Sequence, residues 1–256
     1  MFAKDLKDLK GFKKAYIQII DGEYVNDAAF YANNGCKLLG MEVELFEDKD
    51  SDTLEIDKDS EIVIAGVPVM IKMFEKFGGL IPNPLDIPDE LKSFCGRKTN
   101  IGTLKELYDT TSYPIFVKPA NKGKLFDGQI VFCKEELGLF QYVDEMDEWN
   151  TKVFSSEVIK IDSEFRCFVI NGEIYDCRKY KGEFSAVPDF KVIQECVDAY
   201  KSAPVAYAID FGVTDKGETI LIEANDGYSL GPYGFDSYNY ARMMILRWKE
   251  IMRVDL

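Results

Sequence analysis

Three side chains near the C-terminal end of the sequence could together hold a hard metal ion: Asp210, Glu223 and Asn225. They stand in two apolar strands, at positions where a plain hairpin would carry Thr or Val. Carboxylate and amide oxygens are the ligands that Mg²⁺ prefers, and crowded carboxylates repel each other unless a cation lies between them. The pattern is therefore typical of a magnesium site, with a surface hairpin of solvated acids as the alternative.

The expected pairing of this hairpin brings the three side chains to one face. Because side chains alternate along a strand, the glutamate and the asparagine of the second strand share a side. We predict that Val213 pairs with Glu218 across the turn. In that register Asp210 lies opposite Leu221 and diagonal to Glu223, on the face that carries the other two ligands.

A lysine and a flexible loop could bind phosphate groups. Lys118 ends an apolar strand and is followed by Pro119, which stops further pairing. The loop 120–128 contains Lys124, a second lysine and two glycines, so its backbone could close over a phosphate while its lysines supply positive charge. A lysine that extends into solvent and an ordinary surface hairpin are the alternatives.

A charged hairpin lies between these two candidate sites. Glu164 and Arg166 are two residues apart on a strand and therefore share a face, and an Asn-Gly turn follows at 171–172. Arg178 ends the next strand, close to Lys181. Surface hairpins with exposed ion pairs have the same composition, so this signal is weak when it stands alone.

The composition restricts the possible chemistry. The sequence has 256 residues and no histidine, which excludes Ser-His and Cys-His nucleophilic catalysis and His-based zinc sites. Phosphate chemistry that uses carboxylates, lysines, arginines and a hard cation fits the remaining residue types. The net charge of −14 argues against a nucleic-acid partner, which normally meets a basic face.

The chain also has features of a cytoplasmic protein. It contains no run of about 18 apolar residues, the length that a membrane span needs, and its N-terminus lacks the apolar core of a signal peptide. The six cysteines form no CxxC motif, so we expect reduced thiols. We predict a cytoplasmic protein with no membrane partner.

The order of expected elements indicates two regions. Strands at 15–20, 41–46 and 61–65, with helices at 25–39 and 69–77, predict a small α/β lobe, and three prolines between 82 and 88 predict a linker. The second region is expected to contain short helices at 91–95 and 103–108, strands at 114–119, 129–133, 153–159, 164–170 and 173–178, a helix capped by Asp189, the hairpin described above and a closing helix at 238–254.

This order and its motifs resemble the ATP-grasp superfamily. The resemblance rests on the segments 116–119 (Phe-Val-Lys-Pro) and 156–166, and on Asp210 followed by 223–225 (Glu-Ala-Asn). The segments 164–172 and 223–231 are most similar to a divergent clade that is found in bacteria and phages. That clade is characterised by an arginine and two lysines, and it includes a eukaryotic chaperone of translation-initiation-factor assembly.

The resemblance implies an α+β fold. In an ATP-grasp fold two α+β lobes enclose ATP, and a small α/β pre-ATP-grasp lobe precedes them. We expect the preceding lobe at 1–80 and the ATP-grasp region at 81–256. The linker and first lobe of that region would cover 81–155, and the second lobe, with the metal site, would cover 156–256.

The resemblance also implies roles for the basic residues near the linker. Lys118 would reach the α- and β-phosphates of ATP, with Lys98 or Arg97 as a second basic contact. The loop 120–128, which carries Lys124, would close over the triphosphate.

The remaining roles follow from the same resemblance. Glu157 and Val158 would offer main-chain hydrogen bonds to adenine, and Glu164 would accept the ribose hydroxyls. The two carboxylates and the amide would hold Mg²⁺ against the phosphates. Arg166 and Arg178 would stabilise charge on the γ-phosphate or on an acyl-phosphate, with Lys181 as a substitute.

The implied function is an ATP- and Mg²⁺-dependent carboxylate-amine ligase that works through an acyl-phosphate on a peptide or protein, in the cytoplasm of a bacterium or of a phage-infected cell. The carboxylate and amine substrates cannot be read from the sequence. Aromatic residues between 228 and 240 could line the acceptor site or pack the last helix. The alternatives are an ATP-binding assembly chaperone that ligates nothing and an ATP-grasp kinase.

Overall fold

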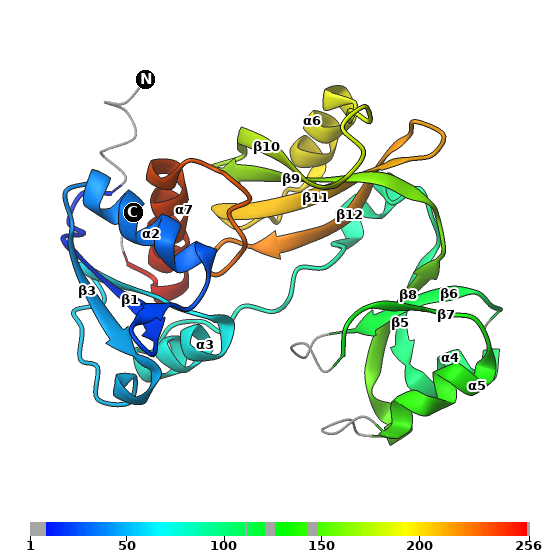
Figure 1. The fold of residues 1–256 in the computed structure, drawn as a ribbon, viewed down its shortest axis with the longest axis horizontal. Coiled ribbons are helices and arrows are strands. Elements are labelled where there is room, and N and C mark those ends of the chain that lie inside the picture. The colour runs from blue at the N-terminus through cyan, green and yellow to red at the C-terminus, as the bar shows by residue number, and fades with distance from the viewer. Residues whose placement is uncertain (1–8, 111, 121–125, 143–147, 255–256) are drawn as a thin grey trace.

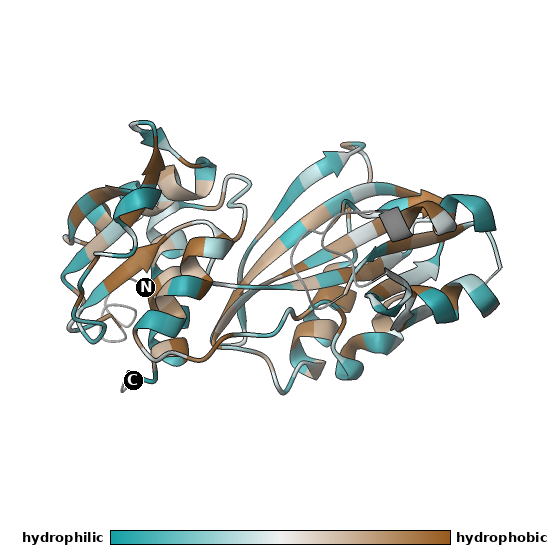
Figure 2. Cartoon of the chain, turned by 90° about the horizontal axis from the view of Figure 1, so that it is seen from below, coloured by the Kyte–Doolittle hydropathy of each residue, from teal (hydrophilic) through white to brown (hydrophobic). Residues whose placement is uncertain are grey.

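The computed structural model describes residues 9–110, 112–120, 126–142 and 148–254. Over these residues the chain forms three four-stranded sheets, which are seen from different sides in Figures 1 and 2. Helices alternate hydrophilic and hydrophobic segments, as Figure 2 shows, because each of them packs one face on a sheet or on another helix. No helix in the described part of the chain is long and apolar enough to cross a membrane.

The N-terminal sheet is built around its first strand. Its strands are β1 (Lys14–Ile20), β2 (Glu23–Tyr24), β3 (Glu42–Glu47) and β4 (Glu61–Ile64), and its helices are α2 (Asp27–Leu38) and α3 (Val67–Lys76). β1 pairs in parallel with both β3 and β4, while β2 returns antiparallel beside the end of β1. Parallel pairing requires crossover connections, and α2 provides the one between β1 and β3. The short α/β architecture expected here is present.

The last helix returns to this N-terminal sheet. The helix α7 (Ser237–Met252) lies beside α2, as Figure 1 shows, and both contribute buried side chains to one continuous core with β1 and β4. At Gly35 of α2 an added Cβ would lie 1.9 Å from the carbonyl oxygen of Ser237. The absence of a side chain there lets the two helix backbones meet.

The central sheet has the order β5-β8-β6-β7. Its elements are β5 (Thr99–Thr103), α4 (Leu104–Thr110), β6 (Ile115–Pro119), β7 (Gln129–Val131), α5 (Lys134–Gly138) and β8 (Lys152–Glu157). The sequence did not indicate β5, because this edge strand is half exposed and carries no alternation of apolar and polar residues. The sheet and its helices enclose a small core of their own.

The C-terminal sheet is antiparallel throughout, in the order β10-β9-β11-β12. Its elements are β9 (Ile161–Ile170), β10 (Glu173–Gly182), α6 (Phe190–Ala199), β11 (Ala206–Thr214) and β12 (Thr219–Asp226). The predicted turn at Asn171 and Gly172 is confirmed, with φ angles of 52° and 75°. The predicted cap is confirmed too, because the Asp189 side chain accepts a hydrogen bond from the backbone N–H of Lys191.

Short 3-10 helices complete the fold: η1 (Asp48–Asp50), η2 (Asp89–Phe94), η3 (Leu139–Tyr142) and η4 (Glu148–Asn150). The linker that contains η2 leaves α3 and passes β12 on its way to the central sheet; Asp86 forms an isolated bridge with Ala224 there. β8 continues into β9 through three residues, so the central and C-terminal sheets are joined directly.

Candidate active site

A row of charged side chains crosses the C-terminal sheet. Arg178 on β10 pairs with Arg166 on β9, Arg166 pairs with Asp210 on β11, and Asp210 pairs with Glu223 on β12. Directly paired residues of neighbouring strands point to the same face of a sheet. The row therefore presents two cations beside two carboxylates on one face.

The predicted register of the β11–β12 hairpin is wrong. Val213 pairs with Thr219 instead of Glu218, and a β-bulge between Asp210 and Phe211 shifts the pairing once more. As a result Asp210 lies directly opposite Glu223, where a diagonal position was expected. A bulge places two residues of one strand against one of its partner, which a strict two-residue alternation cannot anticipate.

Arg166 and Asp210 form a buried, bidentate ion pair. The Arg166 Nε lies 2.8 Å from Oδ1 of Asp210, and its Nη2 lies 2.7 Å from Oδ2. Burial by itself lowers the pKa of Arg166, but the hydrogen bonds and the charge of Asp210 outweigh burial and raise that pKa above its ordinary value. Both groups are therefore charged at neutral pH.

Asn225 completes the predicted metal trio. Its Nδ2 lies 3.3 Å from Oδ2 of Asp210 and 3.3 Å from Oε1 of Glu223, so the amide bridges the two carboxylates. Among the residues that the structure describes, no group of three or more Asp, Glu, Cys or His side chains is arranged to hold a metal ion. The amide oxygen of Asn225 is thus needed as the third donor, and two carboxylates with an amide form a donor set that suits Mg²⁺.

Lys118 connects the central sheet to this row. It lies at the end of β6, and its Nζ is 2.6 Å from Oε2 of Glu223 and 2.7 Å from Oδ1 of Asp86. Burial lowers the pKa of Lys118, whereas the two carboxylates raise it, and the net pKa is above its ordinary value. Burial likewise raises the pKa of Glu223, but Lys118 and Asn225 outweigh burial and leave that pKa below its ordinary value.

Asp86 is a residue that the sequence analysis missed. It lies in the linker, where the prolines alone had attracted notice, and no periodic pattern marks its position. Its one sequence signal is its residue type, since Asp is among the few residues other than Gly that adopt positive φ readily. The structure gives it a φ of 44°.

Glu164 and its partners lie further along the face of β9. The Oε1 of Glu164 is 2.6 Å from Nζ of Lys181, and the hydroxyl of Tyr180 donates to Oε2 at 2.9 Å. Arg178, although it belongs to the charged row, turns back to Asp176 at 2.6 Å on its own strand. Lys181 is thus placed beside Glu164, and Arg178 is directed away from the carboxylates of the trio.

Comparison with known proteins identifies the family. Residues 94–243, more than half of the chain, match the model of family 2 of the ATP-grasp domains in the clade named for an arginine and two lysines. The chain belongs to this ATP-grasp family. The family and the fold class predicted from the sequence are confirmed, and membership supports ATP-dependent ligase chemistry.

Solved structures show the same fold at low sequence identity. The D-alanine–D-alanine ligase from Bacillus anthracis complexed with ATP is 17% identical, with 94% of this chain and 98% of that chain covered and a TM-score of 0.55. The L-amino acid ligase from Bacillus licheniformis is 15% identical, with 94% and 76% covered and a TM-score of 0.58. The comparison with curated proteins gives no match.

The other predicted ATP contacts lie where the ATP-grasp chain passes between its sheets. Glu157 ends β8, and Val158 begins the short connection to β9. The backbone N–H of Lys98 donates to the Glu157 carboxylate at 2.9 Å, and the Lys98 side chain is 90% exposed. Arg97 instead donates to backbone carbonyls, among them that of Leu221 at 2.8 Å, which ties the linker to β12. Lys124 lies outside the described residues.

A pocket of about 790 Å³ opens beside the charged row of this ATP-grasp protein. The starts of α2 and α3 and the loop 229–234 line it. Within that loop Tyr233 stacks on Tyr180 at 4.7 Å, and the Arg166 guanidinium lies 4.9 Å from the Tyr233 ring. Phe235 and Tyr240 are fully buried and pack the core. Of these aromatic side chains, Tyr233 lines the pocket, whereas Phe235 and Tyr240 stabilise the fold.

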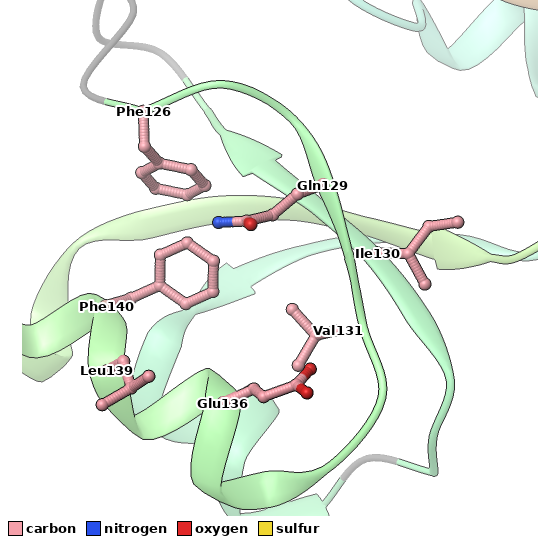
Figure 3. A pocket seen from close by; sticks show the side chains of 7 residues that line it. All are labelled: Phe126, Gln129, Ile130, Val131, Glu136, Leu139 and Phe140. Carbon is pink, nitrogen blue, oxygen red and sulfur yellow. The ribbon is translucent and has the colours of Figure 1, made fainter.

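A second pocket, of about 250 Å³, lies in the central lobe (Figure 3). Its lining comes from Phe126, from β7, from Glu136 of α5 and from η3, and the rings of Phe126 and Phe140 are 4.5 Å apart. Among its described lining residues, none was predicted to bind ATP or a metal ion. Its walls are mainly apolar, which does not suit phosphate chemistry.

Proposed function

We propose that the chain is an ATP- and Mg²⁺-dependent carboxylate-amine ligase that acts through an acyl-phosphate on a peptide or protein. One observation carries the proposal: Lys118 of the central sheet meets the trio of Asp210, Glu223 and Asn225 of the C-terminal sheet at hydrogen-bond distance. An ATP-grasp fold binds its nucleotide between these two sheets. The contact therefore joins a phosphate-binding cation to a cation-binding trio across the nucleotide cleft.

The residues present fit Mg²⁺ in their chemistry. Glu223 and Asn225 are only partly buried, and rotation of the Asn225 amide would turn its oxygen toward the two carboxylates in place of its nitrogen. When bound, Mg²⁺ neutralises charge on the phosphates. Lys118 would then bind the phosphate oxygens that its present carboxylate partner no longer competes for.

The proposed reaction has two steps. A substrate carboxylate oxygen attacks the γ-phosphorus of ATP, and ADP leaves, which gives an acyl-phosphate. An amine nitrogen then attacks the acyl carbon, phosphate leaves, and the amine loses a proton as the amide forms. Arg166 lies beside the pocket and can stabilise negative charge on the transferred phosphoryl group, which requires positioning and charge rather than a protein nucleophile.

The pocket beside Arg166 is the proposed entry of the acceptor substrate. It is open and lined by backbone of the loop 229–234 as well as by side chains of α2. An open pocket can accommodate the end of a peptide, whose remaining residues extend into solvent. Arg178 and Lys181, both partly exposed, are proposed to contact the substrate or the γ-phosphate after their present partners are displaced.

The test is ADP release by the purified protein in the presence of Mg²⁺ and pools of amino acids, peptides or proteins, followed by mass spectrometry of the product. An amide product formed with one ADP per bond supports the ligase. A stable phosphorylated product without an amide would favour the kinase. Nucleotide binding with capture of a partner and no turnover would favour the assembly chaperone.

A further inference from the structure

Asp86 is held in place by the strand that carries the proposed metal ligands. Its backbone carbonyl accepts a hydrogen bond from the N–H of Ala224 at 2.6 Å. Ala224 lies between Glu223 and Asn225 in the sequence, so the linker is attached to β12 in the middle of the trio. The positive φ of Asp86 is the local backbone conformation in which this attachment is made.

The Asp86 side chain is committed to Lys118. Its Oδ1 lies 2.7 Å from the Lys118 Nζ, and the two side chains are 17% and 19% exposed. The ring of Phe154 lies on another side of the ammonium group, with its centroid 5.2 Å from Nζ. Lys118 is therefore enclosed by Asp86, Glu223 and an aromatic ring, and these three groups fix where its charge lies.

The two carboxylates that hold Lys118 have different tasks in the proposed reaction. The oxygens of Glu223 are needed by the cation, so the contact between Glu223 and Lys118 weakens when Mg²⁺ and ATP bind. Asp86 belongs to the linker and is not part of the trio. Because an ammonium group has three N–H donors, Asp86 can keep one of them while the other two bind phosphate oxygens.

We propose that Asp86 is a positioning residue for ATP binding: it holds the Lys118 ammonium group at the cleft between the central and C-terminal sheets when Glu223 turns to the cation. The inference rests on the proposed function, because it assigns a task to Asp86 only if Lys118 binds phosphate. It accounts for a buried acid at positive φ in an otherwise irregular linker.

The experiment measures the affinity for a non-hydrolysable ATP analogue in excess Mg²⁺ by calorimetry, together with KM for ATP and kcat. Asp86→Asn removes the charge and keeps a residue that tolerates positive φ. We expect about tenfold weaker binding and a KM raised by a similar factor, with little change in kcat. Asp86→Gly relieves the backbone and removes the whole side chain, and it should lose at least as much affinity.

Asp89→Asn is the matched control. Asp89 lies on the same linker, its side chain is 90% exposed, and its partner is Lys92 at 2.6 Å. This change removes the same charge close to the site without contact to Lys118, so its affinity should equal that of the unmodified protein. Thermal unfolding of each variant checks that the fold is intact.

A double-mutant cycle separates positioning from other effects. Lys118→Met alone should weaken analogue binding, and adding Asp86→Asn to it should cause no further loss. An equal loss in both backgrounds, unchanged affinity in Asp86→Asn, or full affinity in Asp86→Gly would overturn the inference. If the unmodified protein binds no nucleotide, or if Lys118→Met binds normally, the proposed phosphate site itself is wrong.

Discussion

Arg166 and Asp210 face each other across β9 and β11 and share two hydrogen bonds, of 2.8 and 2.7 Å. One of the proposed catalytic cations is thus neutralised by one of the proposed metal ligands. Lys118 and Glu223 repeat this relationship across the two sheets at 2.6 Å. In this structure the cations of the site balance its carboxylates, and Mg²⁺ with ATP would exchange these partners.

The buried ion pair predicts a large effect on stability. Arg166→Met leaves the Asp210 carboxylate buried without its bidentate partner, and we expect the free energy of unfolding to fall by about 3–5 kcal/mol. Arg178→Met removes a cation from the same row, but that side chain is 44% exposed and pairs with Asp176 on its own strand, so the expected loss is below about 1 kcal/mol. Urea unfolding of the two variants measures the difference. Similar losses in both variants would contradict a dominant role for the buried pair.

The metal trio predicts a specific loss of activity. Glu223→Gln keeps the shape of the side chain and removes the charge that a divalent cation needs, so Mg²⁺-dependent ADP release should be abolished. Glu218→Gln, on the exposed turn of the same hairpin, is the control and should retain full activity. Undiminished turnover in Glu223→Gln would show that the cation is held elsewhere.

The same glutamate predicts a pH dependence of stability. Burial raises the pKa of Glu223, but Lys118 outweighs burial, so in the folded protein this pKa lies below its ordinary value of 4.5. A depressed pKa stabilises the fold above the unfolded-state pKa, and that stabilisation is lost as the pH falls through the folded-state value. The unmodified protein should therefore lose more of its melting temperature between about pH 5 and pH 3 than Glu223→Gln does. Parallel curves for the two proteins would argue against the ion pair.

The contact between α2 and α7 predicts an effect of inverted sign. Gly→Ala in a helix is ordinarily stabilising by up to about 1 kcal/mol. In Gly35→Ala the new methyl group would meet the Ser237 carbonyl, so we expect a destabilisation of about 1–3 kcal/mol instead. In Gly138→Ala, in α5, the methyl group would lie at an ordinary 3.6 Å from Tyr108, and the change should be neutral or stabilising. Thermal unfolding distinguishes the two, and a stabilised Gly35→Ala would contradict the close packing.

The sequence alone indicated most of the elements because their patterns are local. The Asn171-Gly172 turn, the Asp189 cap and the helices of the N-terminal lobe depend on neighbouring residues, which the sequence displays in order. The choice of Asp210, Glu223 and Asn225 as one group also followed from strand alternation and the family resemblance. The structure brings these three side chains together.

Tertiary structure decided what depends on contacts between distant segments. The bulge that sets Asp210 opposite Glu223 is a property of two paired strands, and neither strand shows it when read separately. Asp86 reaches Lys118 across 32 positions of sequence because the linker bridges to Ala224. Residue types and their periodicity determine which groups are available for chemistry, whereas the packing of the sheets determines which of them meet.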